Sequence, residues 1–100
     1  MRDVKAFNRE VRQAIGFQLY KVQNGFEPSD WKPMPTIGSG VREIRIHAEG
    51  ECRVIYVAHF AKAVYVLHAF AKKTQRTSRN DVALVCERLK QVLRVRKGDQ

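Results

Sequence analysis

The sequence predicts a small α+β domain with an N-terminal helix, a mainly antiparallel sheet of three or more strands, and a C-terminal helix. Near both ends of the chain, apolar residues recur every three or four positions, as in amphipathic helices. Between them lie three runs rich in β-branched residues, joined by connections too short for the crossover that parallel strands require. The 100 residues, 44% of them hydrophobic, suffice for a single domain spanning residues 1–100.

The first helix is predicted over residues 3–24. Its apolar face consists of Val4, Phe7, Val11, Ile15, Leu19 and Val22. Gly16 is unfavourable within a helix by about 1 kcal/mol relative to alanine, so it indicates a kink, a break into two helices or a close contact. The Asn24-Gly25 pair is a typical helix stop.

Residues 26–40 contain three prolines and two glycines, which predicts a loop without regular structure. Within it, Trp31 and Met34 are expected to anchor the loop to the body of the domain. Stacking of an exposed Trp31 on a nucleic-acid base is the alternative.

The three strands are predicted at Val41–His47, at residues 51–58 and at Ala63–Ala71. In the first, Ile44 and Ile46 alternate with polar residues, so one face is apolar. The second is apolar on both faces. The third is almost entirely apolar, which predicts a central strand covered on both sides. The short connections indicate an antiparallel meander.

A polar loop follows the third strand, and then the last helix begins. Ser78-x-x-Asp81 resembles a capping box, with aspartate in place of the usual glutamate or glutamine. The helical stripe comprises Val82, Val85, Cys86, Leu89, Val92 and Leu93, and Lys97-Gly98 is predicted to end the helix.

The chain carries 19 Lys and Arg against 10 Asp and Glu, a net charge of +9. Such a field attracts polyanions, among them RNA, DNA, ribosomes and anionic membranes, and also acidic proteins. No signal peptide or membrane-spanning run is recognisable, so a cytoplasmic location without membrane association is expected. Cys52 and Cys86 are interpreted as buried thiols, with a disulfide between them as the alternative.

Two basic features are candidates for a phosphate site. Arg45 and Arg53 lie on adjacent predicted strands and are expected on one sheet face; each needs an anionic partner, either a ligand or an internal carboxylate such as Glu43 or Glu51. The second feature is a concentration of basic residues after the third strand: 72, 73, 76, 79, 88, 90, 94, 96 and 97. The alternative for this cluster is a solvated surface.

Patterns of other enzyme classes are missing. The sequence contains no GxSxG, P-loop or HExxH motif, and no carboxylate cluster for magnesium. The spacing of cysteines and histidines fits no zinc site, so neither a metal nor a cofactor is predicted. His68 is interpreted as a hydrogen-bonded core residue, whereas His47, on the Arg45 face, is the better acid/base candidate.

Several segments together resemble a known family: Trp31-Lys32-Pro33-Met34, Gly38-x-Gly40-Val41-Arg42-Glu43-Ile44-Arg45, Arg53-Val54-Ile55-Tyr56, Leu67-His68-Ala69-Phe70-Ala71-Lys72-Lys73-Thr74 and Arg88-Leu89. They are similar to the phage-derived HigB-like branch of the RelE/ParE toxin superfamily, from Phe7 to Leu93. The resemblance implies a RelE-like fold and the toxin of a type II toxin–antitoxin system. It further implies ribosome-dependent cleavage of mRNA without a metal.

By this resemblance, Arg53 matches the strand arginine placed against the scissile phosphate. Lys73, with Lys72, matches the basic residue at the end of the next strand, and Arg45 would support the RNA backbone. Contacts to RNA are expected from Arg76, Arg79 and Lys72. RelE-type enzymes often carry a catalytic tyrosine in a short C-terminal tail, which this chain lacks, so the general base is open between His47 and Lys72.

The resemblance also implies a cognate antitoxin, expected to be of the helix-turn-helix type, that covers the basic site with acidic and apolar residues. The other expected partners are mRNA and the ribosome. Two alternatives stay open. One is a ParE-like toxin that binds DNA gyrase; the other is a nucleic-acid-binding module without catalysis.

Overall fold

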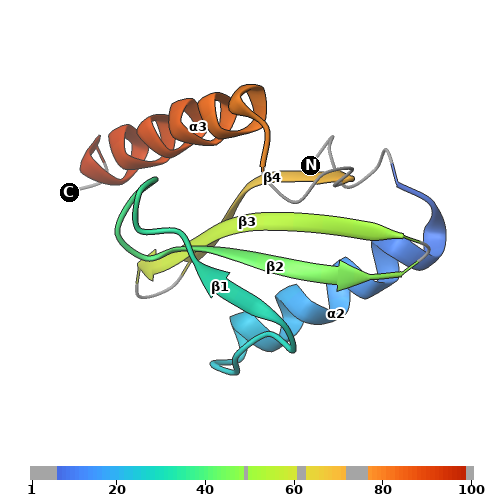
Figure 1. Cartoon of the computed structure of the whole chain (residues 1–100). Helices are drawn as coiled ribbons and strands as arrows, with labels where there is room; N and C mark the ends of the chain where they lie inside the picture. Colours follow the sequence, from blue (N-terminus) through green and yellow to red (C-terminus); the bar gives the residue numbers. More distant parts are fainter. Residues whose placement is uncertain (1–6, 49, 61–62, 72–76, 99–100) are drawn as a thin grey trace.

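A computed structural model describes residues 7–48, 50–60, 63–71 and 77–98 of the chain (Figure 1). The described elements are α2 (Arg9–Gln23), β1 (Trp31–Pro33), β2 (Val41–His47), β3 (Glu51–Phe60), β4 (Ala63–Ala71) and α3 (Arg79–Gly98). All three strand pairings are antiparallel, and the sheet order is β1-β2-β3-β4. The sheet lies between the two helices, which confirms the α+β prediction and the meander.

Helix α2 ends where the sequence indicates, but it begins at Arg9, so the described residues Phe7 and Asn8 of the predicted span 3–24 are not helical. Asn8 is its N-cap, with the Val11 amide donating to the Asn8 side-chain oxygen over 2.9 Å. The helix is unbroken through Gly16, where an added Cβ would meet nothing within 4 Å, so neither a break nor a close contact is present at this residue. Asn24 is the C-cap, and Gly25 follows in the left-handed region with a φ of 83°.

The prediction that residues 26–40 contain no regular element is wrong, because β1 pairs with β2 there. Pro33 lacks a backbone donor, but it ends a strand at the edge of the sheet, where that donor is not required. The anchoring residues are as predicted: Met34 packs against the core. Trp31 is half-buried, and the centre of its ring lies 4.1 Å from the guanidinium carbon of Arg42.

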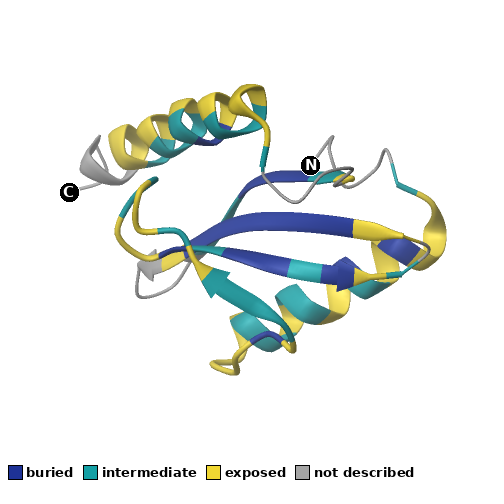
Figure 2. Cartoon of the chain, viewed as in Figure 1, coloured by how far each residue is buried: buried dark blue, intermediate teal, exposed yellow. Residues whose placement is uncertain are grey.

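Most of β2 and β3 is buried (Figure 2), and two apolar cores lie on the two faces of the sheet. The core on the α2 side joins Val11, Ile15, Ile44, Ile46, Cys52, Val54, Tyr56 and Ala69. The core on the α3 side joins Val41, Ile55, Val57, Leu67 and Val85. Strand β3 contributes to both cores, as its two apolar faces predicted.

Strand β4 is at the edge of the described sheet, which corrects the prediction that it is central. Its apolar character has another cause, since both helices cover it: Ala69 belongs to the α2-side core and Leu67 to the α3-side core. An irregularity in the β3–β4 register lies at this point, because Ile55 pairs with His68 and Tyr56 with Val66. Burial on two faces therefore does not distinguish an edge strand from a central one.

Helix α3 starts at the predicted cap, where the Asp81 amide donates to Ser78 Oγ over 3.1 Å. Val85 is fully buried, and Leu89 packs beside it, whereas Leu93 is 49% exposed and lies outside the packed stripe. A Cβ on Gly38 would lie 2.7 Å from the Leu89 side chain, so a larger residue before β2 would have to displace the tip of that leucine. Neither described helix is long and apolar enough to cross a membrane.

Candidate functional site

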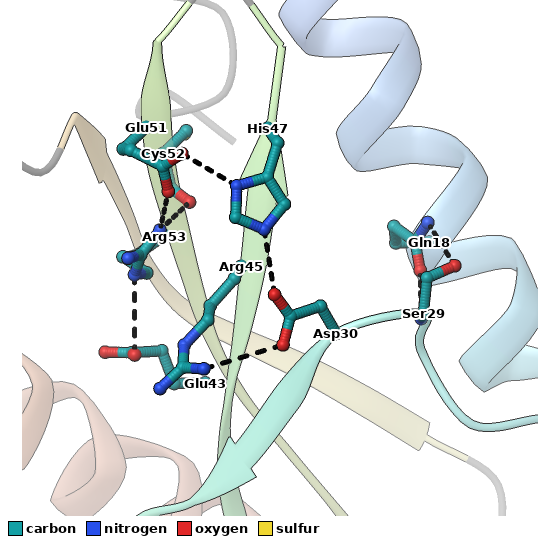
Figure 3. A network of polar contacts seen from close by, with 9 residues as sticks. All are labelled: Gln18, Ser29, Asp30, Glu43, Arg45, His47, Glu51, Cys52 and Arg53. Carbon is teal, nitrogen blue, oxygen red and sulfur yellow. Dashed lines mark hydrogen bonds and ion pairs between the residues drawn. The ribbon is translucent and has the colours of Figure 1, made fainter.

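Charged side chains occupy the part of the α3-facing sheet surface that the α3-side core does not include. Arg45 and Arg53 are direct cross-strand partners, so they share a face as predicted. His47 is likewise opposite Glu51, next to the turn that joins β2 and β3. We call this set the charged network; it comprises Asp30, Lys32, Glu43, Arg45, His47, Glu51, Arg53 and Thr77, most of which Figure 3 shows.

Arg53 is the most enclosed cation of the network, with 8% of the residue exposed. Its Nη1 donates to Glu51 Oε2 over 2.9 Å and to the Cys52 carbonyl over 3.1 Å. Its Nε lies 3.5 Å from Glu43 Oε1. The internal-carboxylate alternative is therefore correct for Arg53, since both Glu43 and Glu51 are its partners.

Glu43 is a carboxylate with no exposed surface at the centre of the network. Thr77 Oγ1 donates to Glu43 Oε2 over 3.2 Å, and Lys32 Nζ lies 3.8 Å from Oε1. Neither Glu43 Oε1 nor Arg53 Nε makes a hydrogen bond. A buried polar atom without a partner costs about 1–3 kcal/mol, so this pair has hydrogen-bonding capacity that the isolated protein leaves unused.

Asp30 brings Arg45 and His47 together from outside the strands (Figure 3). Arg45 Nη1 lies 3.6 Å from Asp30 Oδ1, and the Arg45 amide donates to the Asp30 carbonyl over 2.8 Å. Before Asp30, the Ser29 amide donates to the Gln18 side-chain oxygen on α2 over 2.8 Å. The loop that supplies Asp30 is thereby fixed to both a helix and a strand.

His47 lies between two carboxylates. Its Nε2 is 2.8 Å from Asp30 Oδ2, and its Nδ1 is 2.7 Å from Glu51 Oε1. Both ring nitrogens must carry protons to donate to both oxygens, so this geometry selects the imidazolium. The hydrogen bond to Asp30, followed by that to Glu51, raises the pKa of His47. The bond from His47 in turn lowers the pKa values of Asp30 and Glu51.

Charge is nearly balanced within the network. Lys32, Arg45, Arg53 and the His47 imidazolium give four positive charges, and Asp30, Glu43 and Glu51 give three negative ones, a net of +1. Its guanidinium groups are consequently ordered by internal carboxylates. A phosphate that binds there must replace at least one carboxylate as a partner, and it meets donors whose positions are already set.

Of the other predicted site residues, Lys72, Lys73 and Arg76 lie outside the described residues, and Arg79 is exposed at the first position of α3. The described residues that flank the segment 72–76 both lie at the network: Ala71 is the cross-strand partner of Cys52, and Thr77 donates to Glu43.

His68 is a core residue, as predicted: it is buried, stacks on Phe70 and places Nε2 2.7 Å from Asp81 Oδ1. Cys52 and Cys86 are free thiols. Burial raises the pKa of Cys52 to about 11. In the described part of the chain, no three His, Cys, Asp or Glu side chains gather where they could hold a metal ion.

Sequence reasoning did not find Asp30, Lys32 or Thr77 as members of the network. Asp30 and Lys32 lie in the segment interpreted as an irregular loop, where β1 brings Lys32 opposite Glu43. The available signal was Trp31, a strong strand former, followed by a proline that an edge strand tolerates. For Thr77 the sequence offers no such signal, because its contact with Glu43 spans 34 positions.

A family model described as "Phage derived protein Gp49-like (DUF891)" matches residues 2–90 of the chain. The match covers every strand and reaches into α3. A search of curated proteins found no match, and neither did a search of solved structures.

Proposed function

We propose, because the chain belongs to the phage-derived Gp49-like protein family, that it is the toxin of a type II toxin–antitoxin system and cleaves mRNA on the ribosome. Family membership is consistent with a toxin-like module. The finer assignment, to a HigB-like endoribonuclease of the RelE superfamily, rests on the segments that resemble that branch. It rests also on one observation of the network. Arg45 and Arg53 lie side by side, and Arg53 forms a buried ion pair with Glu43 that is incompletely hydrogen-bonded.

The proposed reaction is a transesterification within the RNA. The 2′-hydroxyl loses its proton and attacks the adjacent phosphorus, the bond from phosphorus to the 5′-oxygen breaks, and that oxygen takes a proton. A 2′,3′-cyclic phosphate and a 5′-hydroxyl end result. Negative charge grows on the non-bridging oxygens in the transition state, so fixed guanidinium groups accelerate the step by electrostatic stabilisation. The residues assigned to this step require no metal ion.

Arg53 and Arg45 supply that stabilisation in the proposal. His47 faces a carboxylate with each ring nitrogen, and these hydrogen bonds raise its pKa and favour the imidazolium, so in the proposal it acts as the proton donor to the leaving 5′-oxygen and not as the base. Lys73 and Lys72 contribute the remaining positive charge, as the resemblance implies, and Arg76 and Arg79 bind the flanking RNA. Glu51 and Asp30 are partly exposed, which lets their carboxylates turn into solvent when a phosphodiester takes their place.

The same network also supports a second candidate, a nucleic-acid-binding module without catalysis. The observation in its favour is that Lys32, Arg45 and Arg53 each have a carboxylate within 4 Å. Cations held in this way can exchange a carboxylate for a phosphate of RNA, and such an exchange binds the RNA without a chemical step. In that case an Arg53 variant binds RNA more weakly, and there is no cleavage step for the substitution to abolish.

The test is induction of the protein in cells followed by mapping of RNA 5′ ends, alongside Arg53→Ala and Lys73→Ala variants. Arg12→Ala is the matched control, because Arg12 is an exposed arginine on α2. New mRNA ends are expected within translated codons for the natural protein and the control, with a loss of at least a hundredfold in Arg53→Ala, as for removal of one transition-state donor. Unchanged ends in every sample contradict the nuclease, and inhibited supercoiling by purified gyrase then identifies the ParE-like alternative.

The partner and the location are proposed on the same basis. A cognate antitoxin, expected to carry a helix-turn-helix, is proposed to cover the charged network in the cytoplasm, with its acidic groups near Arg45 and Arg53. Co-purification of the product of the adjacent gene tests the pairing. A complex that an Arg45→Glu variant does not weaken argues against this surface as the interface.

A further inference from the structure

A cavity lies on the sheet face opposite the charged network. Its volume is about 270 Å³, and it is bounded by the end of α2, the start of β2 and the end of β3. The apolar part of its wall is made by Val22, Phe26 and Ala58, and the polar part by Glu27, Arg42 and Tyr56. At about 30 Å³ for each water molecule in the liquid, the space suits a small organic group.

The hydroxyl of Tyr56 in this wall makes no hydrogen bond of ordinary geometry. Burial raises the pKa of Tyr56, and the polar group that acts on the hydroxyl is the Arg42 guanidinium, whose effect on that pKa is smaller. The tyrosine has no exposed surface and packs in the α2-side core, where a phenylalanine would supply the same ring. Buried tyrosine hydroxyls usually find a partner, and an unpartnered one lowers stability. The oxygen atom therefore has hydrogen-bonding capacity that the isolated fold leaves unused, with the Arg42 guanidinium beside it.

Arg42 is the direct cross-strand partner of Tyr56, so the two lie side by side. The guanidinium carbon of Arg42 stacks 4.1 Å from the centre of the Trp31 ring, which fixes it through a cation–π contact. Its Nη1 lies 3.5 Å from Glu27 Oε1, and that glutamate side chain is 62% exposed. Glu27 is thus free to turn away, whereas Arg42 is held in place.

We propose that this cavity binds a carboxylate on a short apolar body. The carboxylate takes the place of Glu27 on Arg42 and accepts the hydroxyl proton of Tyr56, and the apolar body packs against Phe26 and Val22. A free organic acid and the acidic side chain of a bound protein share this chemistry. The site is independent of the proposed nuclease function, because none of its side chains belongs to the charged network.

Trp31 is the only tryptophan of the chain and touches Arg42, so its fluorescence reports occupancy. The first probe is 3-phenylpropionate, and the second is a capped peptide with one glutamate between apolar residues. We expect saturable quenching by at least one probe. Tighter binding of the free acid identifies a small-molecule site, and tighter binding of the peptide identifies a protein contact. No saturable change with either probe overturns the proposal.

Two variants define the polar contacts. Tyr56→Phe is expected to bind the probe at least tenfold more weakly, as for loss of a hydrogen bond to a charged group, with a melting temperature that does not fall. Glu27→Gln is expected to bind it more tightly, because the competing carboxylate is gone. Equal binding by Tyr56→Phe, weaker binding by Glu27→Gln or preferential binding of 2-phenylethylamine would each overturn the assignment. Arg12→Ala changes an exposed arginine on α2 outside the cavity wall and is the control that leaves probe binding unchanged.

Discussion

The two faces of the sheet are built differently. The α2-facing side is apolar from Cys52 to Tyr56 along β3, and its core is continuous with Val11 and Ile15 of the helix. The α3-facing side is apolar only around Val41, Ile55 and Val57, and the rest of it carries the charged network. One face thus stabilises the fold by burying apolar side chains. The other face holds ionic groups at positions where apolar side chains would stabilise the fold more. A buried ion pair contributes little net stability, so the charged network is the place to seek the proposed cleavage of RNA.

The largest effect is expected from shortening a core side chain on the α2-facing side. Ile44 is fully buried there. Ile44→Ala should lower the free energy of unfolding by roughly 2–5 kcal/mol, the usual cost of a buried Ile→Ala change. Urea unfolding measures it. A loss below about 1 kcal/mol would mean that this face is less tightly packed than its burial indicates.

Breaking the Glu43–Arg53 pair is expected to lower the free energy of unfolding by somewhat less than Ile44→Ala does. Glu43→Gln should lower the free energy of unfolding by about 2–3 kcal/mol, below the 3–5 kcal/mol typical of a broken buried pair, because Arg53 retains Glu51. The double variant Glu43→Leu, Arg53→Met removes both charges and should recover most of that loss. RNA cleavage should disappear in the double variant. A double variant as unstable as Glu43→Gln would show that the pair itself stabilises the fold.

The smallest effect is expected at His47, which is exposed together with its partners. Its raised pKa means that its contribution to stability is complete below its unfolded value of 6.5 and is lost as pH rises through the folded pKa. The lowered pKa of Asp30 acts in the other direction. That contribution is present above the unfolded value of 3.8 and is lost as pH falls through the folded pKa.

His47→Gln should therefore flatten the pH profile of stability most on the alkaline side of neutrality, and by less than the Glu43 effect, because solvent screens the pair. Melting temperatures between pH 5 and 9, in steps of about half a unit across the range where histidine titrates, measure the profile. Superimposable profiles of the natural protein and the variant would mean that Asp30 and Glu51 do not hold the imidazolium in solution.

The contrast between the faces also explains how far sequence could go. Periodicity located α2, β2 and α3, because each of them alternates or repeats its apolar residues, and a continuous apolar run located β4. It could not order the strands: β4 is apolar because two helices cover it, and that cover hides its place at the edge. It also could not find β1, whose pairing with β2 is a property of the folded sheet.

For the charged network, alternation placed Arg45 and Arg53 on one face, but alternation says nothing about which ion pairs form. Asp30 reaches His47 across 17 positions, and Thr77 reaches Glu43 across 34. Only the sheet register and the anchoring of Ser29 by Gln18 bring these residues together. The tertiary structure, and not the local pattern, therefore decides whether an arginine is bare or paired.

The simple strand order has a consequence for how quickly the chain folds. Each strand pairs only with its neighbour in sequence, so the sheet forms by closing successive hairpins and never waits for a distant segment. Domains rich in such local contacts cross a low entropic barrier and fold rapidly. Most of the charged network lies between residues 30 and 53, within β1 to β3. In a newly synthesised chain, the strands that carry these charges are therefore complete before the last helix is made.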